Sequence, residues 1–361
     1  MKLLKLCGDN FRNYSAFEWE PQAGLNVLVG DNAQGKTNLL EAINILATGK
    51  SWRTSRDLEI IGPQGDATWL FGLVENTYTT SKLEFRLGRG KQIAVNGKPV
   101  RKYSDLLGKL LVVTFTPDNL ELVKGSPHSR RKFLDQCLVQ ISESYSHNLT
   151  GYNKALQQRN SLLREGMGRK SLLEPWNEQL VAFGVQLMIY RFKALERLGE
   201  LTCRYQDYLS EEKEQLSLAY QPAVPMPQKR TAQAWAAVFY QQLERELPQE
   251  RIRGGTLTGP QRDDLLFLID GKELKLYGSQ GQQRTAALAL HLAALAHLEE
   301  QMGERPLLLL DDVLSELDRG RRERLFDLID SGTQTILTTT AADLWEQRNC
   351  WQIVAGTISR L

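Results

Sequence analysis

A glycine-rich loop near the amino terminus constrains the fold and the chemistry of this chain more than any other feature. Residues 30–37 read GDNAQGKT and satisfy the pattern G-x-x-x-x-G-K-[ST]. The apolar stretch LNVLV at 25–29 predicts a strand before the loop, and the spacing of apolar residues over 36–48 predicts a helix after it. Strand, loop and helix in this order indicate a phosphate-binding loop rather than a chance glycine turn.

The chemistry of that loop predicts a nucleoside triphosphate with Mg²⁺. Successive backbone N–H groups at the start of a helix form a cradle for phosphates. Lys36 is expected to place a point charge at the β and γ phosphates, and the Thr37 hydroxyl is expected to ligate Mg²⁺. We therefore expect ATP to contact the residues of the loop, which are Gly30, Asp31, Asn32, Ala33, Gln34, Gly35, Lys36 and Thr37.

The second half of the site is expected at LLLLDD, residues 307–312. A near-continuous apolar run is typical of a strand buried on both faces, and α/β sheets bind ligands at the carboxyl ends of such strands. Asp311 is then the Mg²⁺ partner, through water, and Asp312 is the candidate base that orients the attacking water. The alternative is that the two acids cap the next helix. Most of the chain separates Lys36 from Asp311, so a whole lobe is inserted between the halves of the site.

The sequence GSQGQQR at 278–284 predicts a second anion site, because a serine and a glycine open an apolar helix at 280–301. The segment contains no lysine of its own, so it could serve as part of the binding site for a γ-phosphate that another molecule brings. The alternative is an N-cap serine in a glutamine-rich loop. Further along, SELD at 315–318 follows the acidic strand, and threonines at 338–340 end the next strand, where a polar group could sense the γ-phosphate.

The sequence pattern divides the chain into three segments. Residues 1–128 hold the phosphate loop and a basic antiparallel meander, and residues 254–361 return to alternating strands and helices. Between them, residues 129–253 form the all-helical lobe, with helices predicted at 130–143, 152–165, 175–214 and 231–247. The predicted fold class is α/β, and the inserted lobe is too short and too broken for a long coiled coil.

Composition places the chain among soluble globular proteins. With 361 residues, 42% of them hydrophobic and 24% charged, it is too long for one small module and too apolar for a disordered chain. The four cysteines lie far apart and form no CxxC pair, which argues against a disulfide framework and a zinc site. The longest apolar stretch is too short to span a bilayer. We therefore expect a cytoplasmic protein with no membrane partner.

The formal net charge of +2 conceals a basic cluster at 82–109, where eight Lys and Arg residues face only Glu84 and Asp105. Such a patch is typical of contact with nucleic acid, although Lys and Arg also cover the exposed faces of edge strands. The candidates for contact with DNA are Arg89, Lys91, Lys98, Arg101 and Lys102.

Four motifs in this order, GDNAQGKT, SQGQQ, LLLLDD and SELD, resemble those of ABC-type ATPase heads of the SMC group. Within that group, four further segments are similar to the RecF family of bacterial recombination and gap-repair proteins. These are FRNY at 11–14, KSWRTSRD at 50–57, TFTPDNLELVKGSPHSRRKFLD at 114–135 and TGPQRDD at 258–264. The resemblance covers essentially the whole chain and is weakest in the helical lobe. It implies a P-loop ABC/SMC-type ATPase head.

The resemblance also implies roles for individual residues. Arg12 and Asn13 would lie near the nucleotide, and Thr339 would occupy the switch position. The residues implied to act across a dimer are Ser279, Gly281 and Gln282, which would contact the ATP of the partner copy, and Asp318 in the loop that communicates between the copies.

Activity and partners are implied in the same way. RecF-like proteins form an ATP-dependent homodimer, bind double-stranded and gapped DNA, hydrolyse ATP weakly, and work with RecR and RecO to help RecA load at single-strand gaps. Two positions depart from the general ABC pattern, since Gln280 replaces the usual glycine and Asp312 stands where glutamate is commoner. The shorter carboxylate fits a slow switch. The rival functions are the nucleotide-binding subunit of an ABC transporter and a P-loop kinase or nuclease-linked ATPase.

Overall fold

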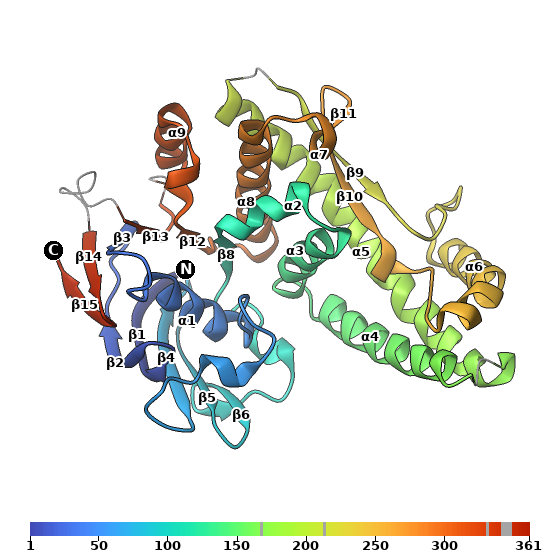
Figure 1. Cartoon of the computed structure of the whole chain (residues 1–361), viewed down its shortest axis with the longest axis horizontal. Helices are drawn as coiled ribbons and strands as arrows, with labels where there is room; N and C mark the ends of the chain where they lie inside the picture. The colour runs from blue at the N-terminus through green and yellow to red at the C-terminus, as the bar shows by residue number, and fades with distance from the viewer. Residues whose placement is uncertain (167–168, 212–213, 330–331, 341–348) are drawn as a thin grey trace.

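The computed structural model describes residues 1–166, 169–211, 214–329, 332–340 and 349–361. Figure 1 shows two sheets packed around helix α1 (Lys36–Thr48) on one side and a helical lobe that extends away from them on the other. Both ends of the chain lie on the side of the sheets (Figure 1). This arrangement agrees with the predicted α/β head that carries an inserted helical lobe.

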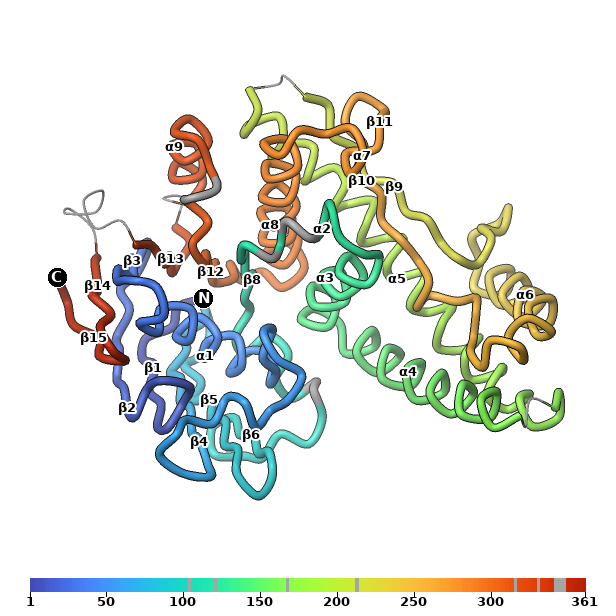
Figure 2. The backbone as a smooth tube through the Cα atoms, in the orientation of Figure 1, coloured from blue at the N-terminus to red at the C-terminus, as the bar shows by residue number. Residues whose placement is uncertain are grey.

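A mostly parallel sheet carries the phosphate loop. Its strand order is β15-β14-β3-β13-β12-β8, and only β15 runs antiparallel to its neighbour. Every residue of β3, β12 and β13 is buried, which explains their apolar character. Figure 2 shows the N-terminal β3 between the C-terminal β13 and β14. The strands are β3 (Leu25–Val29), β8 (Val112–Phe115), β12 (Leu307–Asp311), β13 (Thr335–Thr339), β14 (Asn349–Val354) and β15 (Thr357–Arg360).

An antiparallel sheet covers the outer side of α1 and has the order β2-β1-β4-β5-β6-β7. Buried and half-buried residues alternate along β4, as expected for a sheet that packs on one face. Apolar residues of both sheets and of α1 form one core cluster, so the helix that follows the phosphate loop is held between two layers. The strands are β1 (Lys2–Phe11), β2 (Tyr14–Trp19), β4 (Thr68–Glu75), β5 (Thr80–Leu87), β6 (Lys91–Val95) and β7 (Lys98–Pro99).

The helical lobe contains four long helices, and its boundaries correct those expected from the sequence. The helix predicted at 130–143 ends at Val139, because Ser142 caps the next helix and its Oγ accepts a hydrogen bond from Tyr145 N at 3.0 Å. The helix predicted to end before Pro248 continues to Arg253. The four helices are α3 (Pro127–Val139), α4 (Glu143–Arg164), α5 (Lys170–Ser210) and α6 (Ala232–Arg253).

The lobe also contains a small antiparallel sheet of order β11-β10-β9, which the sequence reading missed in part. Strand β10 (Asp264–Ile269) pairs with β9 (Leu216–Gln221), so residues on both sides of position 254 contribute to the lobe. The 41-residue α5 is the longest helix of the described chain, far short of a long coiled coil. The remaining strand is β11 (Lys272–Glu273).

The last group of elements joins the lobe to the parallel sheet. Helix α8 packs against α5 and against β8, on the face of the sheet opposite α1. Short 3₁₀ helices lie at Asp57–Ile60, Tyr103–Leu106, Pro117–Leu120, Pro260–Arg262 and Val313–Glu316. The remaining α-helices are α2 (Glu121–Lys124), α7 (Leu274–Tyr277), α8 (Gln280–Met302) and α9 (Arg319–Ile329).

Candidate nucleotide-binding site

The phosphate loop connects β3 to α1, as predicted. Gly35 has a φ of 118°, a conformation that residues with a side chain rarely adopt, and a Cβ there would lie 2.8 Å from the hydroxyl of Tyr14. Ala33 is also in the left-handed region, with a φ of 64°. The Lys36 ammonium is folded onto the loop and donates to Gly30 O at 2.6 Å and to Asp31 O at 2.8 Å.

The electrostatics of Lys36 favour an anionic ligand. Burial lowers the pKa of its ammonium group, while the carboxylates of Asp312, Asp311 and Asp31 act in the opposite direction. A triphosphate beside Lys36 would add negative charge and raise this pKa. The lysine is therefore placed where a phosphate would stabilise its positive charge.

The acidic strand meets the phosphate loop through hydroxyl groups. Asp311 is 7% exposed, and its Oδ1 accepts hydrogen bonds from the hydroxyls of Thr37 and Thr338, both at 2.8 Å. The Thr338 hydroxyl in turn accepts from Asp312 N at 2.9 Å. Asp312 has a φ of 49°, in the left-handed region, so the backbone turns sharply after strand β12. Thr37 and Asp311 supply hard oxygen atoms, which fit Mg²⁺.

Two threonines at the end of β13 contact the phosphate loop and the acidic strand. Thr339 was predicted from the sequence, and its backbone oxygen accepts from Gly30 N at 3.3 Å, directly at the phosphate loop. Thr338 belongs to the same predicted run of threonines but was not singled out, and its hydroxyl bonds to Asp311. The run of threonines was the available signal, but alternation along a strand does not say which hydroxyl faces the neighbouring strand's carboxylate until the register is known.

The turn between β1 and β2 lies beside the phosphate loop. Asn13 Nδ2 donates to Gln34 O at 2.9 Å, and the Tyr14 hydroxyl donates to Gly35 O at 3.1 Å. Asn38 Nδ2 donates to Asn13 Oδ1 at 2.7 Å, which ties the turn to α1. The structure thus brings Asn13 against the phosphate loop.

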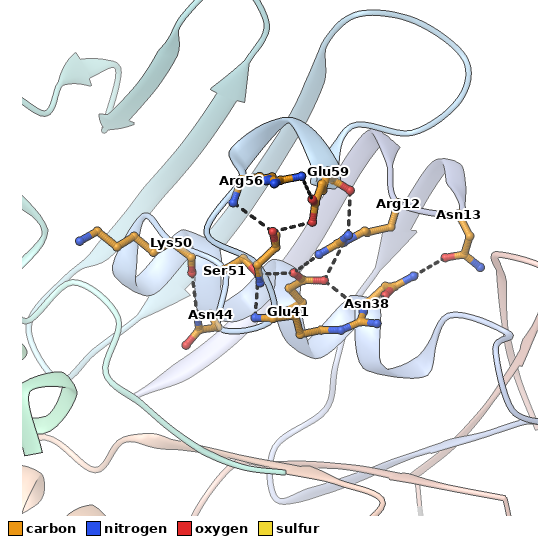
Figure 3. Close-up of polar contacts among 11 residues, drawn as sticks. Arg12, Asn13, Asn38, Glu41, Asn44, Lys50, Ser51, Arg56 and Glu59 are labelled. Carbon is orange, nitrogen blue, oxygen red and sulfur yellow. Dashed lines mark hydrogen bonds and ion pairs between the residues drawn. The ribbon is translucent and has the colours of Figure 1, made fainter. Parts of the chain in front are cut away.

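Arg12 points to the other side of the same turn. Its guanidinium donates to both carboxylate oxygens of Glu41, at 3.0 and 2.6 Å, and Glu41 is completely buried in α1. The hydroxyl of Ser51 and the guanidinium of Arg53 also contact Glu41. Figure 3 shows Arg12 and Ser51 converging on this carboxylate from different segments. Arg12 therefore holds the turn to α1, and the geometry gives it no direct contact with the phosphate loop.

The segment at 278–284 begins α8 with a capping box. Ser279 Oγ accepts from Gln282 N at 3.2 Å, and Gln282 Oε1 accepts from Ser279 N at 2.8 Å. A Cβ on Gly281 would lie 3.3 Å from the guanidinium of Arg321, which also pairs with Asp318 at 2.8 Å. The serine is thus an N-cap within this chain. Residues 278–284, called the signature segment from here on, lie next to Arg321 and its partner Asp318.

The signature segment is distant from the phosphate loop of its own chain. Figure 1 places α7 and the start of α8 at the far end of that helix from the parallel sheet, well away from β3 and α1. Ser279 and Gln280 are exposed. The described residues contain no hydrogen bond between this segment and residues 30–37. A ligand that touched both would have to lie between two copies of the chain.

The candidate DNA-contacting residues lie on the antiparallel sheet and the loop that follows it, and all are exposed. Lys91 forms an ion pair with Asp57 at 2.9 Å, and the backbone N–H groups of Arg101 and Lys102 donate to Asp105. Lys98 belongs to the edge strand β7. The site residues of this group are Arg89, Lys91, Lys98, Arg101 and Lys102.

Other potential sites receive little support. Within the described residues, no group of three His, Cys, Asp or Glu side chains could hold a metal ion. His291 is packed between Phe115 and Phe133, as a core histidine rather than a ligand. No helix among the described ranges combines the length and apolarity needed to cross a membrane.

Comparison with known proteins finds a family model and relatives that match nearly the whole chain. The family model described as RecF/RecN/SMC N terminal domain matches residues 2–356. The chain is 46% identical to the DNA replication and repair protein RecF of Symbiobacterium thermophilum over 91% of this chain and 89% of that protein. It is 41% identical to the protein of the same name from Halalkalibacterium halodurans, over 95% and 94% of the two chains.

Solved structures give the same result. A structure described as the recombination mediator protein RecF-ATP in the RecFOR pathway has a TM-score of 0.92 and 35% identity, and the match covers 99% of this chain and 97% of that one. An Smc head bound to the C-winged helix domain of ScpA has a TM-score of 0.57 at 15% identity over 100% and 97% of the two chains, which shows a shared fold.

Proposed function

The chain belongs to the RecF family, and from this membership we propose that it is an ATP-driven, dimeric DNA-binding switch of recombinational gap repair. ATP binds to the phosphate loop of one copy, and the signature segment of a second copy completes the binding site. ATP binding then favours the dimer by mass action. Hydrolysis removes the γ-phosphate that both copies contact, and the dimer is no longer favoured.

One observation carries the proposal of a shared site. Ser279 and Gln280 are exposed at the far end of α8 from the parallel sheet, while Lys36 and Asp311 converge at that sheet. Each copy therefore presents two separate halves of an ATP site. Arg321 links the signature segment to Asp318, so both segments can face a partner as one surface.

The proposed chemistry divides among residues of the parallel sheet. Lys36 and the loop N–H groups bind the β and γ phosphates, and Thr37 with Asp311 holds Mg²⁺. Asp312 orients the attacking water and Thr339 senses the γ-phosphate. A carboxylate one methylene shorter than glutamate reaches less far, which fits a weak ATPase. A measured turnover near ~100 s⁻¹, the fast end for phosphoryl transfer, would contradict this assignment.

DNA binding is proposed for the basic surface of the antiparallel sheet. Closure of the dimer would bring two such surfaces together around duplex or gapped DNA, with contacts to phosphates rather than bases. The same switch would present RecR with a DNA-bound dimer and, with RecO, help RecA load at single-strand gaps in the cytoplasm. The relatives are named for DNA replication and repair, so the transporter subunit is not the function we propose.

Sedimentation of the wild type, Lys36→Ala and Ser279→Ala with gapped duplex DNA, each with and without Mg-ATP, tests the proposal. We expect ATP to convert the wild type to a DNA-bound dimer and both variants to remain monomeric. Ser279→Ala should still bind ATP as a monomer, because Ser279 lies outside the phosphate loop. If the wild type binds ATP but stays monomeric with DNA, the shared site is wrong and Ser279 is only a helix cap.

A further inference from the structure

The turn between β14 and β15 contacts the phosphate loop, although the two are at opposite ends of the sequence. Ala355 N donates to Gln34 Oε1 at 2.6 Å, and Gly356 N donates to Gln34 O at 3.2 Å. The side chain of Gln34 is thus turned outward to the hairpin. The C-terminal hairpin therefore holds a residue of the phosphate loop by both its side chain and its backbone.

The β1–β2 turn holds the same peptide from another direction. Gln34 O also accepts from Asn13 Nδ2 at 2.9 Å, and the next carbonyl, Gly35 O, accepts from the Tyr14 hydroxyl at 3.1 Å. A Cβ on Gly356 would lie 2.8 Å from Asn13 O, closer than real Cβ contacts come. The two turns and the phosphate loop thus meet with no space for one added methyl group.

The hairpin also approaches the start of the loop. Strand β14 pairs in parallel with β3, and the backbone oxygen of Ile353 leaves no room for a side chain at Gly30. Contacts at Gly30 and at Gln34 fix the hairpin along the length of the loop. A strand–loop–helix unit by itself, without the β14–β15 hairpin, would lack these contacts.

The peptide geometry connects these contacts to phosphate binding. In a planar trans peptide, the carbonyl oxygen and the N–H of the next residue point in opposite directions. Because the oxygen of Gln34 is held by both turns, the N–H of Gly35 points away from those turns. The oxygen of Gly35 accepts from the Tyr14 hydroxyl and from the N–H groups of Asn38 and Leu39, so the N–H of Lys36 follows the start of α1. Backbone N–H groups at a helix start are the donors that phosphate requires.

We propose that the Ala355–Gly356 turn is a positioning element of the nucleotide site, which orients the N–H donor of Gly35 in the phosphate loop by holding Gln34. This inference rests on the proposed binding of ATP to that loop. The β14–β15 hairpin is then one of the elements that set ATP affinity. Gly356 does not touch the nucleotide and acts through Gln34.

Gly356→Ala tests the inference against a matched control, Gly271→Ala. The turns at Asp270–Gly271 and Ala355–Gly356 have nearly equal φ values, 50° and 75° against 47° and 76°. A Cβ on Gly271 meets nothing within 4 Å. Alanine therefore introduces the same backbone strain in both variants, and only Gly356→Ala displaces a neighbour of the phosphate loop.

The dissociation constant of ATP is measured by calorimetry with each full-length protein, together with the thermal midpoint of unfolding. We expect Gly356→Ala to weaken ATP binding about tenfold, the effect of losing or distorting about one hydrogen bond to a charged ligand. Gly271→Ala should bind ATP like the wild type. Equal ATP affinity in the two folded variants would overturn the inference.

A second variant protects the test if Gly356→Ala fails to fold. Gln34→Ala removes the side-chain acceptor of Ala355 N without adding any atom, and it should weaken ATP binding in the same direction by a smaller factor. Unchanged affinity in this variant would also contradict the proposed positioning. If the wild type itself does not bind ATP, the proposed function fails instead, so the two failures are distinguishable.

Discussion

The hydroxyl of Thr37 donates a 2.8 Å hydrogen bond to Oδ1 of Asp311 and so joins the phosphate loop to the acidic strand. The two residues lie at opposite ends of the sequence, since Thr37 is in the first turn of α1, which follows β3, and Asp311 ends β12. Strands β3 and β12 are not neighbours, because β13 runs between them. Thr338, from that middle strand, donates to the same oxygen. The carboxylate of Asp311, a proposed Mg²⁺ ligand, is therefore held in position by a hydroxyl from the strand between β3 and β12.

Thr338→Val should weaken the use of Mg²⁺ without removing a proposed ligand. Loss of the hydroxyl frees Asp311 from one of its two hydrogen bonds, and loss of such a supporting contact typically costs about 10- to 100-fold in metal affinity. The concentration of Mg²⁺ that gives half-maximal ATP hydrolysis measures this effect. Thr114→Val is the control, because Thr114 lies in β8 of the same sheet and its buried hydroxyl has no hydrogen-bond partner among the described residues.

The helical lobe offers a matched pair of charge contacts for a stability test. Arg159 and Glu250 pair at 2.6 Å with both side chains 0% exposed, whereas Lys170 and Glu244 pair at 2.5 Å on the surface. Glu250→Gln should lower the free energy of unfolding by about 3 to 5 kcal/mol, because it leaves the guanidinium buried without its charge partner. Glu244→Gln should change it by less than about 1 kcal/mol. Urea unfolding of both variants checks the difference, and similar losses would contradict it.

His291 predicts a loss of stability on acidification. Burial lowers the pKa of its imidazole to about 4, against 6.5 in an ordinary environment. The folded state therefore favours the neutral ring, and stability is fully present above pH 6.5. As the pH falls from 6.5 toward 4, the unfolded state takes up the proton first, which costs up to about 3 kcal/mol.

Unfolding measured between pH 7 and pH 4 tests this dependence with His291→Met as the comparison. Methionine fills a similar apolar space between Phe115 and Phe133 and does not titrate. The difference in unfolding free energy between wild type and variant should shift in favour of the variant as the pH falls. A constant difference across this range would show that another group controls the acid response.

The basic surface predicts a salt-dependent affinity for DNA. Replacing Lys98 and Arg101 by alanine should weaken binding to all DNA sequences alike and reduce the slope of log K against log salt by about one per lost phosphate contact. Lys2→Ala is the control, because Lys2 is an exposed lysine of the same sheet outside the basic cluster. A slope unchanged in the double variant would place the DNA contacts elsewhere.

The phosphate loop could be predicted because its information is local. Spacing along one short segment places Gly35, Lys36 and Thr37 on one turn, and the structure has the expected strand, loop and helix. The acidic strand was found for the same reason, since four consecutive leucines leave a recognisable apolar run before Asp311. The boundary between α3 and α4 at Ser142 was missed, because a helix cap within a largely polar stretch hardly changes the spacing of apolar residues.

The sequence alone determined which residues carry charge, hydroxyl groups and backbone freedom at the ends of particular strands. Only the tertiary structure decided which of them meet. The order β14-β3-β13-β12 is a choice of hydrogen-bonded neighbours, and no spacing within one segment encodes it. That order places Thr338 rather than Thr339 on Asp311, and it brings Gly356 to Gln34 across nearly the full length of the chain. These contacts depend on strand pairing and packing, which a local motif does not specify.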